Sequence, residues 1–163
     1  MVLAGDGNDR RRLEERAREL RLDNVQFIEL QGPGLWEAVM EASNVLLVNQ
    51  RPSVTDMSLP SKLTSYFAAN RPVVAAASGD SETAREVEAA GAGYVVPPDD
   101  AHALREAILA VRSDGVAVKL GSSARRYAER TLVSATALAE YDSFLEVVLN
   151  GSRPAPVSAL AAR

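Results

Sequence analysis

The sequence predicts an α/β fold in which helices cover both faces of a mainly parallel sheet. Three observations predict this class: short apolar runs alternate with amphipathic segments, most connections between them are short, and residues 44–49 (NVLLVN) form an apolar run. Such runs are typical of strands inside parallel sheets, and strands that alternate with helices over short connections favour parallel pairing. The 163 residues, 47% hydrophobic and 25% charged, fit about one soluble domain.

The first five elements follow from apolar spacing and from turn residues. Val2–Ala4 is a short apolar strand that ends at a Gly-Asp-Gly turn, and residues 9–20 form an amphipathic helix with apolar residues at helical spacing. A second strand over 25–28 is followed by a Gly-Pro-Gly break and a short helix, Leu35–Ala42. Residues 44–49 form the third strand.

The remaining elements continue this alternation and then add helices alone. A helix over 61–69 is expected to end at Asn70 in the left-handed conformation. Strands are expected over 72–77 and 94–96, with a helix over 81–90 between them. Three further helices are predicted: Ala101–Val111, 117–130 and 135–149.

Composition excludes several classes of function. Eighteen Lys and Arg against 22 Asp and Glu give a net charge of −4, which argues against a nucleic-acid partner. The absence of cysteine excludes disulfides and a Cys nucleophile, and the single histidine, His102, excludes multi-His metal sites and is expected at the surface. No apolar run approaches the roughly 18 residues of a membrane-spanning helix, so a cytoplasmic location is expected. The expected domain covers residues 1–150, before a loose tail over 151–163.

Three strand-to-helix loops lie where open parallel sheets bind ligands, beyond the carboxyl ends of strands. The first, residues 5–10, resembles half of a dinucleotide fingerprint, but Arg10 stands where the third glycine would be. Because Asp6 would also repel a pyrophosphate, a plain turn with Asp6 or Asn8 as helix N-cap is favoured. The arginines 10–12 are interpreted as a solvated helix face balanced by glutamates of the same helix.

The second loop, residues 50–62, is the most informative. It is long and polar, and it ends in Pro-Ser-Lys at the opening of a helix, where Ser61 can cap. Lys62 is one of two lysines in the chain, and a cation in the first helical turn opposes the helix dipole. Because a bound phosphate reverses that sign, we expect Lys62 to face a phosphate, with Ser65 on the same helix face. An exposed lysine on a solvated face is the alternative.

The third loop, residues 78–83 (SGDSET), also leads from a strand into a helix. Its glycine and hydroxyl side chains suit the close approach of a ligand. A plain N-cap formed by Asp80 or Ser81 explains the same residues without a ligand, so both interpretations stay open.

The stretch from Ser43 to Ala77 resembles the nucleotide-sugar half of GT-B glycosyltransferases, and within them family 4 enzymes of the colanic-acid, exopolysaccharide type. The shared blocks are D-x-x-x-P-S-K-L, from Asp56 to Leu63, and A-A-N-R-P-V-V-A, from Ala68 to Ala75. Residues 80–84 (DSETA) and 93–100 (GYVVPPDD) resemble the donor-phosphate loop and the strand and turn that follow it. The resemblance covers roughly residues 1–149.

The resemblance implies the Rossmann-like, carboxyl-terminal half of a GT-B enzyme that transfers a sugar from a nucleoside-diphosphate sugar, with retention, to a glycan or lipid-linked acceptor. It implies no cofactor and no protein-bound metal. Helix N-termini and Lys62 would stabilise the departing diphosphate. No acid, base or nucleophile can be assigned. The implied donor-binding residues are Asp56, Ser58, Ser61, Lys62, Ser65, Ser81, Glu82 and Thr83.

Two departures from the family pattern matter. Met57 and Ser65 stand where many family 4 members carry two glutamates, so Asp56, Ser58 or Lys62 would have to serve instead. The resemblance also implies that the chain enters at the second strand of the family's carboxyl-terminal domain. We therefore expect a fragment that lacks the first strand and the amino-terminal acceptor domain and is inactive alone. Homodimerisation through the exposed apolar surface and peripheral membrane association of the full-length enzyme are further expectations.

Two other functions compete with a transferase. A non-catalytic α/β nucleotide-binding or scaffold module is favoured by the two missing glutamates and the truncated start. A flavodoxin-like or NAD-binding domain is the third interpretation, and the missing third glycine argues against NAD.

Overall fold

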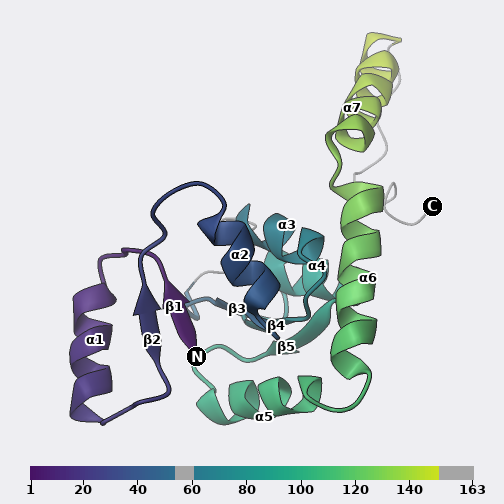
Figure 1. The fold of residues 1–163 in the computed structure, drawn as a ribbon. Helices are drawn as coiled ribbons and strands as arrows, with labels where there is room; N and C mark the ends of the chain where they lie inside the picture. The colour runs from purple at the N-terminus through teal and green to yellow at the C-terminus, as the bar shows by residue number, and fades with distance from the viewer. Residues whose placement is uncertain (54–60, 151–163) are drawn as a thin grey trace. The chain divides into compact units, whose positions relative to one another are not determined.

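The computed structural model describes residues 1–53 and 61–150, and the chain divides into two compact units, Met1–Ala42 and Ser43–Arg163 (Figure 1). The expected domain over 1–150 thus contains two units. The expected tail, 151–163, lies outside the described residues.

The first unit contains two strands and two helices: β1 (Val2–Ala4), α1 (Arg10–Glu19), β2 (Gln26–Ile28) and α2 (Leu35–Ala42). The strands pair in parallel, with Val2 opposite Gln26 and Ala4 opposite Ile28. Gly5 extends this pairing, because its N–H donates to the Ile28 carbonyl at 3.0 Å. Its φ of 125° lies in a region that glycine adopts freely, which explains the glycine at this turn.

The second unit contains the other elements: β3 (Leu46–Asn49), α3 (Ser61–Ala68), β4 (Val73–Ala76), α4 (Glu82–Ala89), β5 (Gly93–Val96), α5 (Ala101–Val111), α6 (Val116–Thr131) and α7 (Ser134–Leu149). Its strands pair in parallel in the order β3-β4-β5. All four residues of β4 are buried, as expected of a central strand with helices on both sides.

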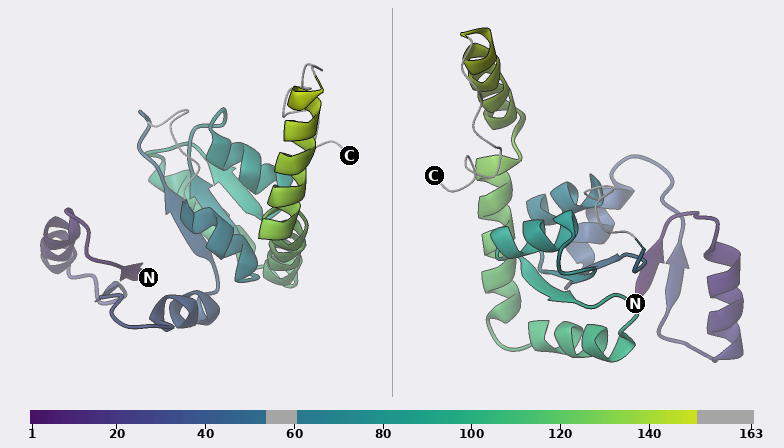
Figure 2. Two further views of the ribbon diagram at one scale, coloured as in Figure 1. Left: turned by 90° about the horizontal axis from the view of Figure 1, so that it is seen from above. Right: turned by 180° about the vertical axis from the view of Figure 1, so that it is seen from behind.

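Helices cover both faces of this three-stranded sheet, with α5 on one side and α3 and α4 on the other (Figure 2). On the first side, Ala107 and Val111 of α5 form a buried cluster with Val74 of β4. On the other side, α6 joins two helices through Tyr127. Its ring meets the ring of Phe67 edge-on, with centroids 5.8 Å apart, and its hydroxyl donates to Glu86 of α4 at 2.9 Å.

The predicted α/β class with parallel strands is confirmed, but the strands form two sheets instead of the expected one. Among the described strands, β1 and β2 pair only with each other, and no strand pairs with the outer edge of β3.

Of the two helix ends predicted from capping residues, one is confirmed and the other is wrong. Asn70 ends α3 with φ of 58°, so the predicted left-handed residue is confirmed. The predicted N-cap at Asp6 or Asn8 is wrong, because Asp9 is the N-cap of α1. The Asp9 carboxylate does not cap the helix and instead pairs with Arg12 at 3.1 Å. Within residues 1–53 and 61–150, no helix is both long and apolar enough to cross a membrane.

Candidate functional site

The candidate site lies at the carboxyl edge of the β3-β4-β5 sheet, within the second unit. The strand register places Asn49 opposite Ala76 and Ala76 opposite Val96, so the three strands end together. The chain passes from the end of β3 through α3 to the start of β4, and from the end of β4 through α4 to the start of β5. Both helices therefore begin at this edge, where the free N–H groups of helix N-termini attract anions.

The first turn of α3 presents the predicted polar residues at the surface. Ser61 and Lys62 are exposed and Ser65 is half-buried. Leu63 and Phe67 of the same helix are fully buried and fix its rotation against the core. Lys62 therefore lies on the solvent side of α3. The predicted residues Asp56 and Ser58 lie outside the described residues.

Ser81 is the N-cap of α4, and its hydroxyl is fully engaged within the protein. It accepts a hydrogen bond from the N–H of Ala84 at 3.2 Å and donates to the carbonyl of Ser78 at 2.6 Å. The side chain is buried, so capping accounts for Ser81 without a ligand. Glu82, the next residue, is exposed and forms an ion pair with Arg85 at 3.2 Å.

Asp80 lies in the same turn and is held by its neighbours. The Ser78 hydroxyl donates to its carboxylate, and the Arg85 guanidinium donates to its backbone carbonyl. The hydrogen bond from Ser78 is the main cause that lowers the pKa of Asp80, with smaller contributions from a backbone N–H and from the charge of Arg85. The turn before α4 is thus a closed polar network that presents a negative charge to solvent.

Two buried polar atoms near this edge lack a hydrogen-bond partner among the described residues: Oε1 of Gln50 and Oγ1 of Thr83. Gln50 directly follows β3, and Thr83, only 1% exposed, lies in the first turn of α4. Leaving a buried polar group unpaired costs about 1–3 kcal/mol. A ligand O–H or N–H that donates to Oε1 of Gln50, or a ligand oxygen that accepts from the Thr83 hydroxyl, would offset that cost. Sequence reasoning included Thr83 but missed Gln50, whose signal was a polar residue directly after an apolar strand.

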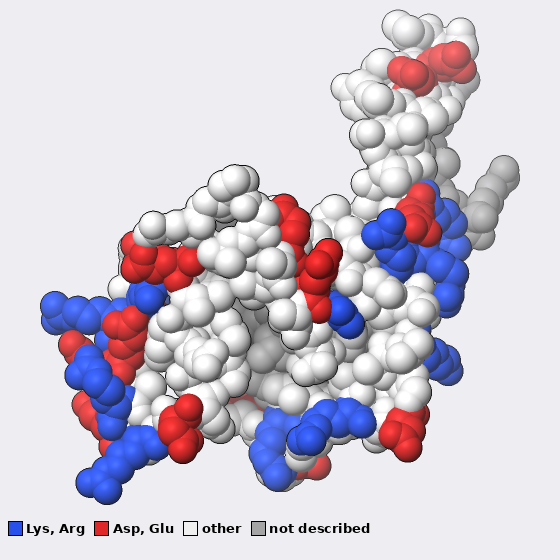
Figure 3. All heavy atoms as spheres, in the orientation of Figure 1, with Lys and Arg blue, Asp and Glu red and all other residues white. Residues whose placement is uncertain are grey.

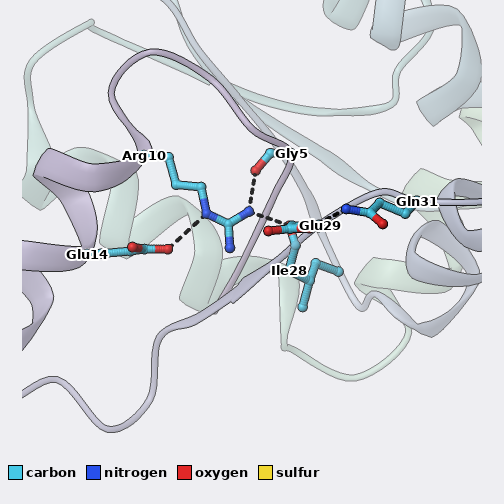
Figure 4. Close-up of polar contacts among 6 residues, drawn as sticks. All are labelled: Gly5, Arg10, Glu14, Ile28, Glu29 and Gln31. Carbon is cyan, nitrogen blue, oxygen red and sulfur yellow. Dashed lines mark hydrogen bonds and ion pairs between the residues drawn. The ribbon is translucent and has the colours of Figure 1, made fainter.

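The first unit has its own carboxyl edge, and Arg10 fills it (Figure 4). The Arg10 guanidinium donates to the carbonyls of Gly5, at 2.9 Å, and Ile28, at 3.4 Å, and pairs with Glu14 at 2.8 Å. Its side chain is only 19% exposed, so the interpretation of Arg10 as a solvated residue is wrong. The hydrogen bond to Glu14 is the main cause that raises the pKa of Arg10. A dinucleotide pyrophosphate would meet this side chain where the fingerprint needs a glycine.

The other arginines of this run do behave as a surface face. Arg11 pairs with Glu15 at 3.3 Å and Arg12 with Asp9 at 3.1 Å, so acidic and basic side chains alternate over α1 (Figure 3). His102 is exposed, as expected. In the part of the chain that the structure describes, no group of three or more His, Asp or Glu side chains could hold a metal ion.

The chain is therefore an α/β protein with a parallel sheet. At the carboxyl edge of that sheet lie two helix N-termini, a lysine and two unpaired polar atoms. Residues 1–114 match the family described as group 1 glycosyl transferases, and the chain therefore belongs to this family.

The chain is also similar to two individual proteins. The chain is 31% identical over 141 residues to WcaI of Escherichia coli (strain K12), whose name describes a colanic acid biosynthesis glycosyl transferase. That match covers 86% of this chain and 34% of WcaI. The fold is similar to that of HepE (Alr3699) of Anabaena, solved in complex with UDP-glucose, with a TM-score of 0.69 and 19% identity over 89% of this chain and 40% of HepE. The chain thus spans about a third of the length of WcaI.

Proposed function

We propose that this chain is the donor-binding part of a retaining, family 4-like glycosyltransferase and forms the carboxyl-terminal, Rossmann-like half of a GT-B fold. The observation that carries the proposal is the exposed Lys62 in the first turn of α3, at the carboxyl edge of a sheet in a group 1 glycosyl transferase. A cation at that position is unfavourable for the helix alone and favourable beside a bound diphosphate.

In this proposal the ligand is a nucleoside-diphosphate sugar, and the diphosphate lies at the N-terminus of α3. Ser61 and Lys62 contact its oxygens, and Lys62 stabilises the negative charge that develops on the leaving group. Ser65 lies one turn further along the helix, on the same face as Lys62. From the sequence, Asp56 and Ser58 complete the contacts to the donor.

The start of α4 supplies the second part of the proposed donor site. Ser81 keeps the turn in place through its capping hydrogen bonds, and the first N–H groups of the helix face the ligand. Thr83 offers its unpaired hydroxyl, and the exposed Glu82 lies beside it in the same turn. The ion pair with Arg85 places a positive charge beside the Glu82 carboxylate, which reduces its repulsion of a diphosphate.

The partners of the whole enzyme belong to the same proposal. The acceptor, a glycan or a lipid-linked sugar, is bound by an amino-terminal domain, so this chain alone binds donor without turnover. The enzyme works in the cytoplasm, needs no cofactor and associates with the membrane only peripherally, through the full-length protein. Self-association of this chain as a homodimer is tested by light scattering.

The experiment is a calorimetric titration of the chain with UDP-glucose and GDP-mannose, in parallel with two variants. Lys62→Ala is expected to weaken binding about tenfold or more, the size of a lost hydrogen bond to a charged group. Lys119→Ala is the matched control, because Lys119 is the other lysine of the chain, is exposed and lies on α6. Equal affinities for wild type and Lys62→Ala would count against the site.

A non-catalytic nucleotide-binding or scaffold module is the second candidate. It is favoured by Met57 and Ser65, which stand where many family 4 enzymes carry glutamates. Thermal-shift measurements separate the two: stabilisation by nucleoside-diphosphate sugars but not by the free sugar supports a donor site, whereas no stabilisation by any nucleoside diphosphate supports a scaffold.

A further inference from the structure

Gln50 directly follows β3, and its backbone holds it at the carboxyl edge of the second unit. Its N–H donates to the carbonyl of Ala76, the last residue of β4, at 2.9 Å. The pairing of β3 with β4 therefore continues one residue beyond Asn49, which lies opposite Ala76. The next hydrogen bond at this edge runs from the Ala77 N–H to the carbonyl of Val96, the last residue of β5, at 3.0 Å. Gln50 is thus fixed beside the turn that leads from β4 into α4.

Strand alternation places the Gln50 side chain on the side of the sheet that α3 and α4 cover (Figure 2). Leu47 packs against the cluster that α5 forms with β4, so Leu46 and Val48 are buried on the opposite face. Gln50 lies two residues beyond Val48 in the same ladder and therefore shares its face. The neighbouring Asn49 shares the face of Leu47 and is exposed. Both helices on the side of Gln50 begin at this edge.

The side-chain oxygen of Gln50 is buried and is not used by the described part of the protein. Its Oε1 atom has no hydrogen-bond partner among residues 1–53 and 61–150, while Gln50 as a whole is half-buried, at the boundary between core and surface. Thr83, in the first turn of α4, contributes a second such atom, Oγ1, and is only 1% exposed. Folding leaves a polar group in this state at a cost, which a hydrogen bond to a ligand removes.

The chemistry of an amide oxygen decides which part of a sugar donor it can contact. A carboxamide oxygen only accepts hydrogen bonds, and the oxygens of an ionised diphosphate also only accept, so the two do not pair. A sugar hydroxyl donates and carries no charge. The helix N-termini and Lys62 therefore suit the diphosphate, whereas Oε1 of Gln50 suits a hydroxyl of the neutral sugar. A buried group that pairs with a substrate hydroxyl also rejects an analogue without it, because the group is then left unpaired.

We infer that Gln50 is a specificity-determining residue of the donor site, with its side-chain oxygen accepting a hydrogen bond from a hydroxyl of the transferred sugar. The inference deepens the proposed function and rests on it, because the ligand must be a nucleoside-diphosphate sugar bound at the carboxyl edge of the second unit. Lys62 acts on the diphosphate, which all such donors share. Gln50 acts on the sugar, which distinguishes one donor from another.

The test separates the sugar from the nucleotide. Wild type, Gln50→Met and Asn49→Leu are titrated by calorimetry with UDP-glucose and GDP-mannose, and with UDP and GDP alone. Methionine is similar to glutamine in length and volume, so Gln50→Met removes the acceptor and keeps the shape. Asn49→Leu is the matched control, because Asn49 is the adjacent amide residue and faces the other side of the sheet. Gln50→Met is expected to weaken the nucleotide sugar about tenfold and its nucleotide less than about twofold, with Asn49→Leu unchanged.

A second set of ligands identifies the hydroxyl. Deoxy analogues of the bound nucleotide sugar, each lacking one hydroxyl of the hexose, are titrated into wild type and Gln50→Met. One analogue is expected to bind wild type about tenfold more weakly than the parent sugar does, whereas Gln50→Met should bind the two equally. Such non-additive losses indicate a direct contact. Additive losses for every analogue would show that Gln50 contacts none of the hydroxyls, and the inference would be wrong.

Thermal unfolding without ligand tests whether Oε1 is unused in the free protein. Replacing an unpaired buried polar group by an apolar group of the same shape is neutral or stabilising. The Tm of Gln50→Met is therefore expected to equal that of the wild type or to exceed it by up to about 4 °C. A clearly lower Tm would show that the oxygen pairs within the protein and would overturn the inference.

Failure of this inference and failure of the proposed function give different results. If Lys62→Ala weakens binding and Gln50→Met does not, the inference fails and the diphosphate site stands. If Gln50→Met weakens nucleotide and nucleotide sugar equally, the residue does not act on the transferred sugar and the inference is again wrong. If Gln50→Met weakens the nucleotide sugar alone while Lys62→Ala has no effect, the inference stands and the diphosphate does not lie at α3. If the wild type binds none of the four ligands, both are wrong.

Discussion

Two carboxyl edges occur in this chain, one in each unit, and both arise from parallel strands joined through a helix. In the first unit the edge is occupied by the Arg10 guanidinium, which binds two backbone carbonyls, and it ends in the acidic Glu29. In the second unit the edge opens onto the first turns of two helices, with Lys62 exposed on one of them. The same backbone geometry thus produces an edge filled by an arginine in one unit and an edge with an exposed lysine in the other. The topology forms the edge in both units, and the residues of the first helical turn decide which groups it presents.

The two units also differ in how much they bury. Of the buried hydrophobic residues among the described parts of the chain, Met40 is the one that belongs to the first unit, and α1 has no buried residue. The second unit contains a continuous core around β4, α3 and α4. Local stability follows buried apolar contacts, so backbone amides of β1 and β2 are expected to exchange with solvent faster than those of β4.

The largest expected effect comes from the core of the second unit. Phe67→Ala removes a fully buried ring that packs edge-on against Tyr127, and the cavity should cost about 3–5 kcal/mol of unfolding free energy. Urea unfolding of wild type and variant measures this loss of unfolding free energy. The control is Phe144→Ala on α7, where the ring is 43% exposed and the cost should be well under half as large. Equal losses would show that the core does not depend on this contact.

The next largest effect distinguishes a structural role of Ser81, at the start of α4, from a role in ligand binding. Ser81→Ala removes the capping hydroxyl and should cost about 1 kcal/mol of unfolding free energy. Ser143→Ala on α7 is the control, because its hydroxyl donates to a helical carbonyl at 2.9 Å and caps nothing. If Ser81 acts only as a cap, the affinity for UDP-glucose stays within about twofold of the wild type, whereas a larger loss would assign its hydroxyl to the ligand.

The contrast between the units also shows what a sequence can predict. Apolar spacing and turn residues predicted every strand and helix of the described chain to within a few residues, because these signals are local. The left-handed Asn70 was predicted for the same reason. The division into two sheets was not, because strand order depends on pairings between distant residues.

The candidate site was predicted less completely than the fold. The exposed Lys62 and the capping Ser81 follow from their positions in the first helical turns, which a sequence displays. Arg10 was misread because its partner Ile28 lies 18 residues away and is a backbone carbonyl, which leaves no mark in the sequence. Gln50 was missed because burial of one side-chain oxygen depends on packing around the strand end.

A smaller effect tests the closed edge of the first unit. Arg10→Ala removes the hydrogen bonds to the Gly5 and Ile28 carbonyls and should loosen the ends of β1 and β2. The amide of Gly5, which donates to Ile28, is therefore expected to exchange several-fold faster by NMR, while amides of β4 keep their rates. Arg11→Ala is the control, because Arg11 is exposed and pairs only along the helix surface with Glu15. Unchanged exchange at Gly5 would show that strand pairing alone holds this edge.

The smallest expected effect concerns the polar turn of the second unit, where Ser78 donates to Asp80. The folded pKa of Asp80 lies below its usual value of about 3.8, so its contribution to stability is present above that pH and is lost as the pH falls through the folded pKa. Ser78→Ala removes the main cause, and the pKa of Asp80 should rise toward its usual value in an NMR titration of the carboxyl group. Ser143→Ala should leave it unchanged. A low pKa that persists in Ser78→Ala would assign the shift to the backbone N–H and to Arg85, and the turn before α4 would then hold its charge without the serine.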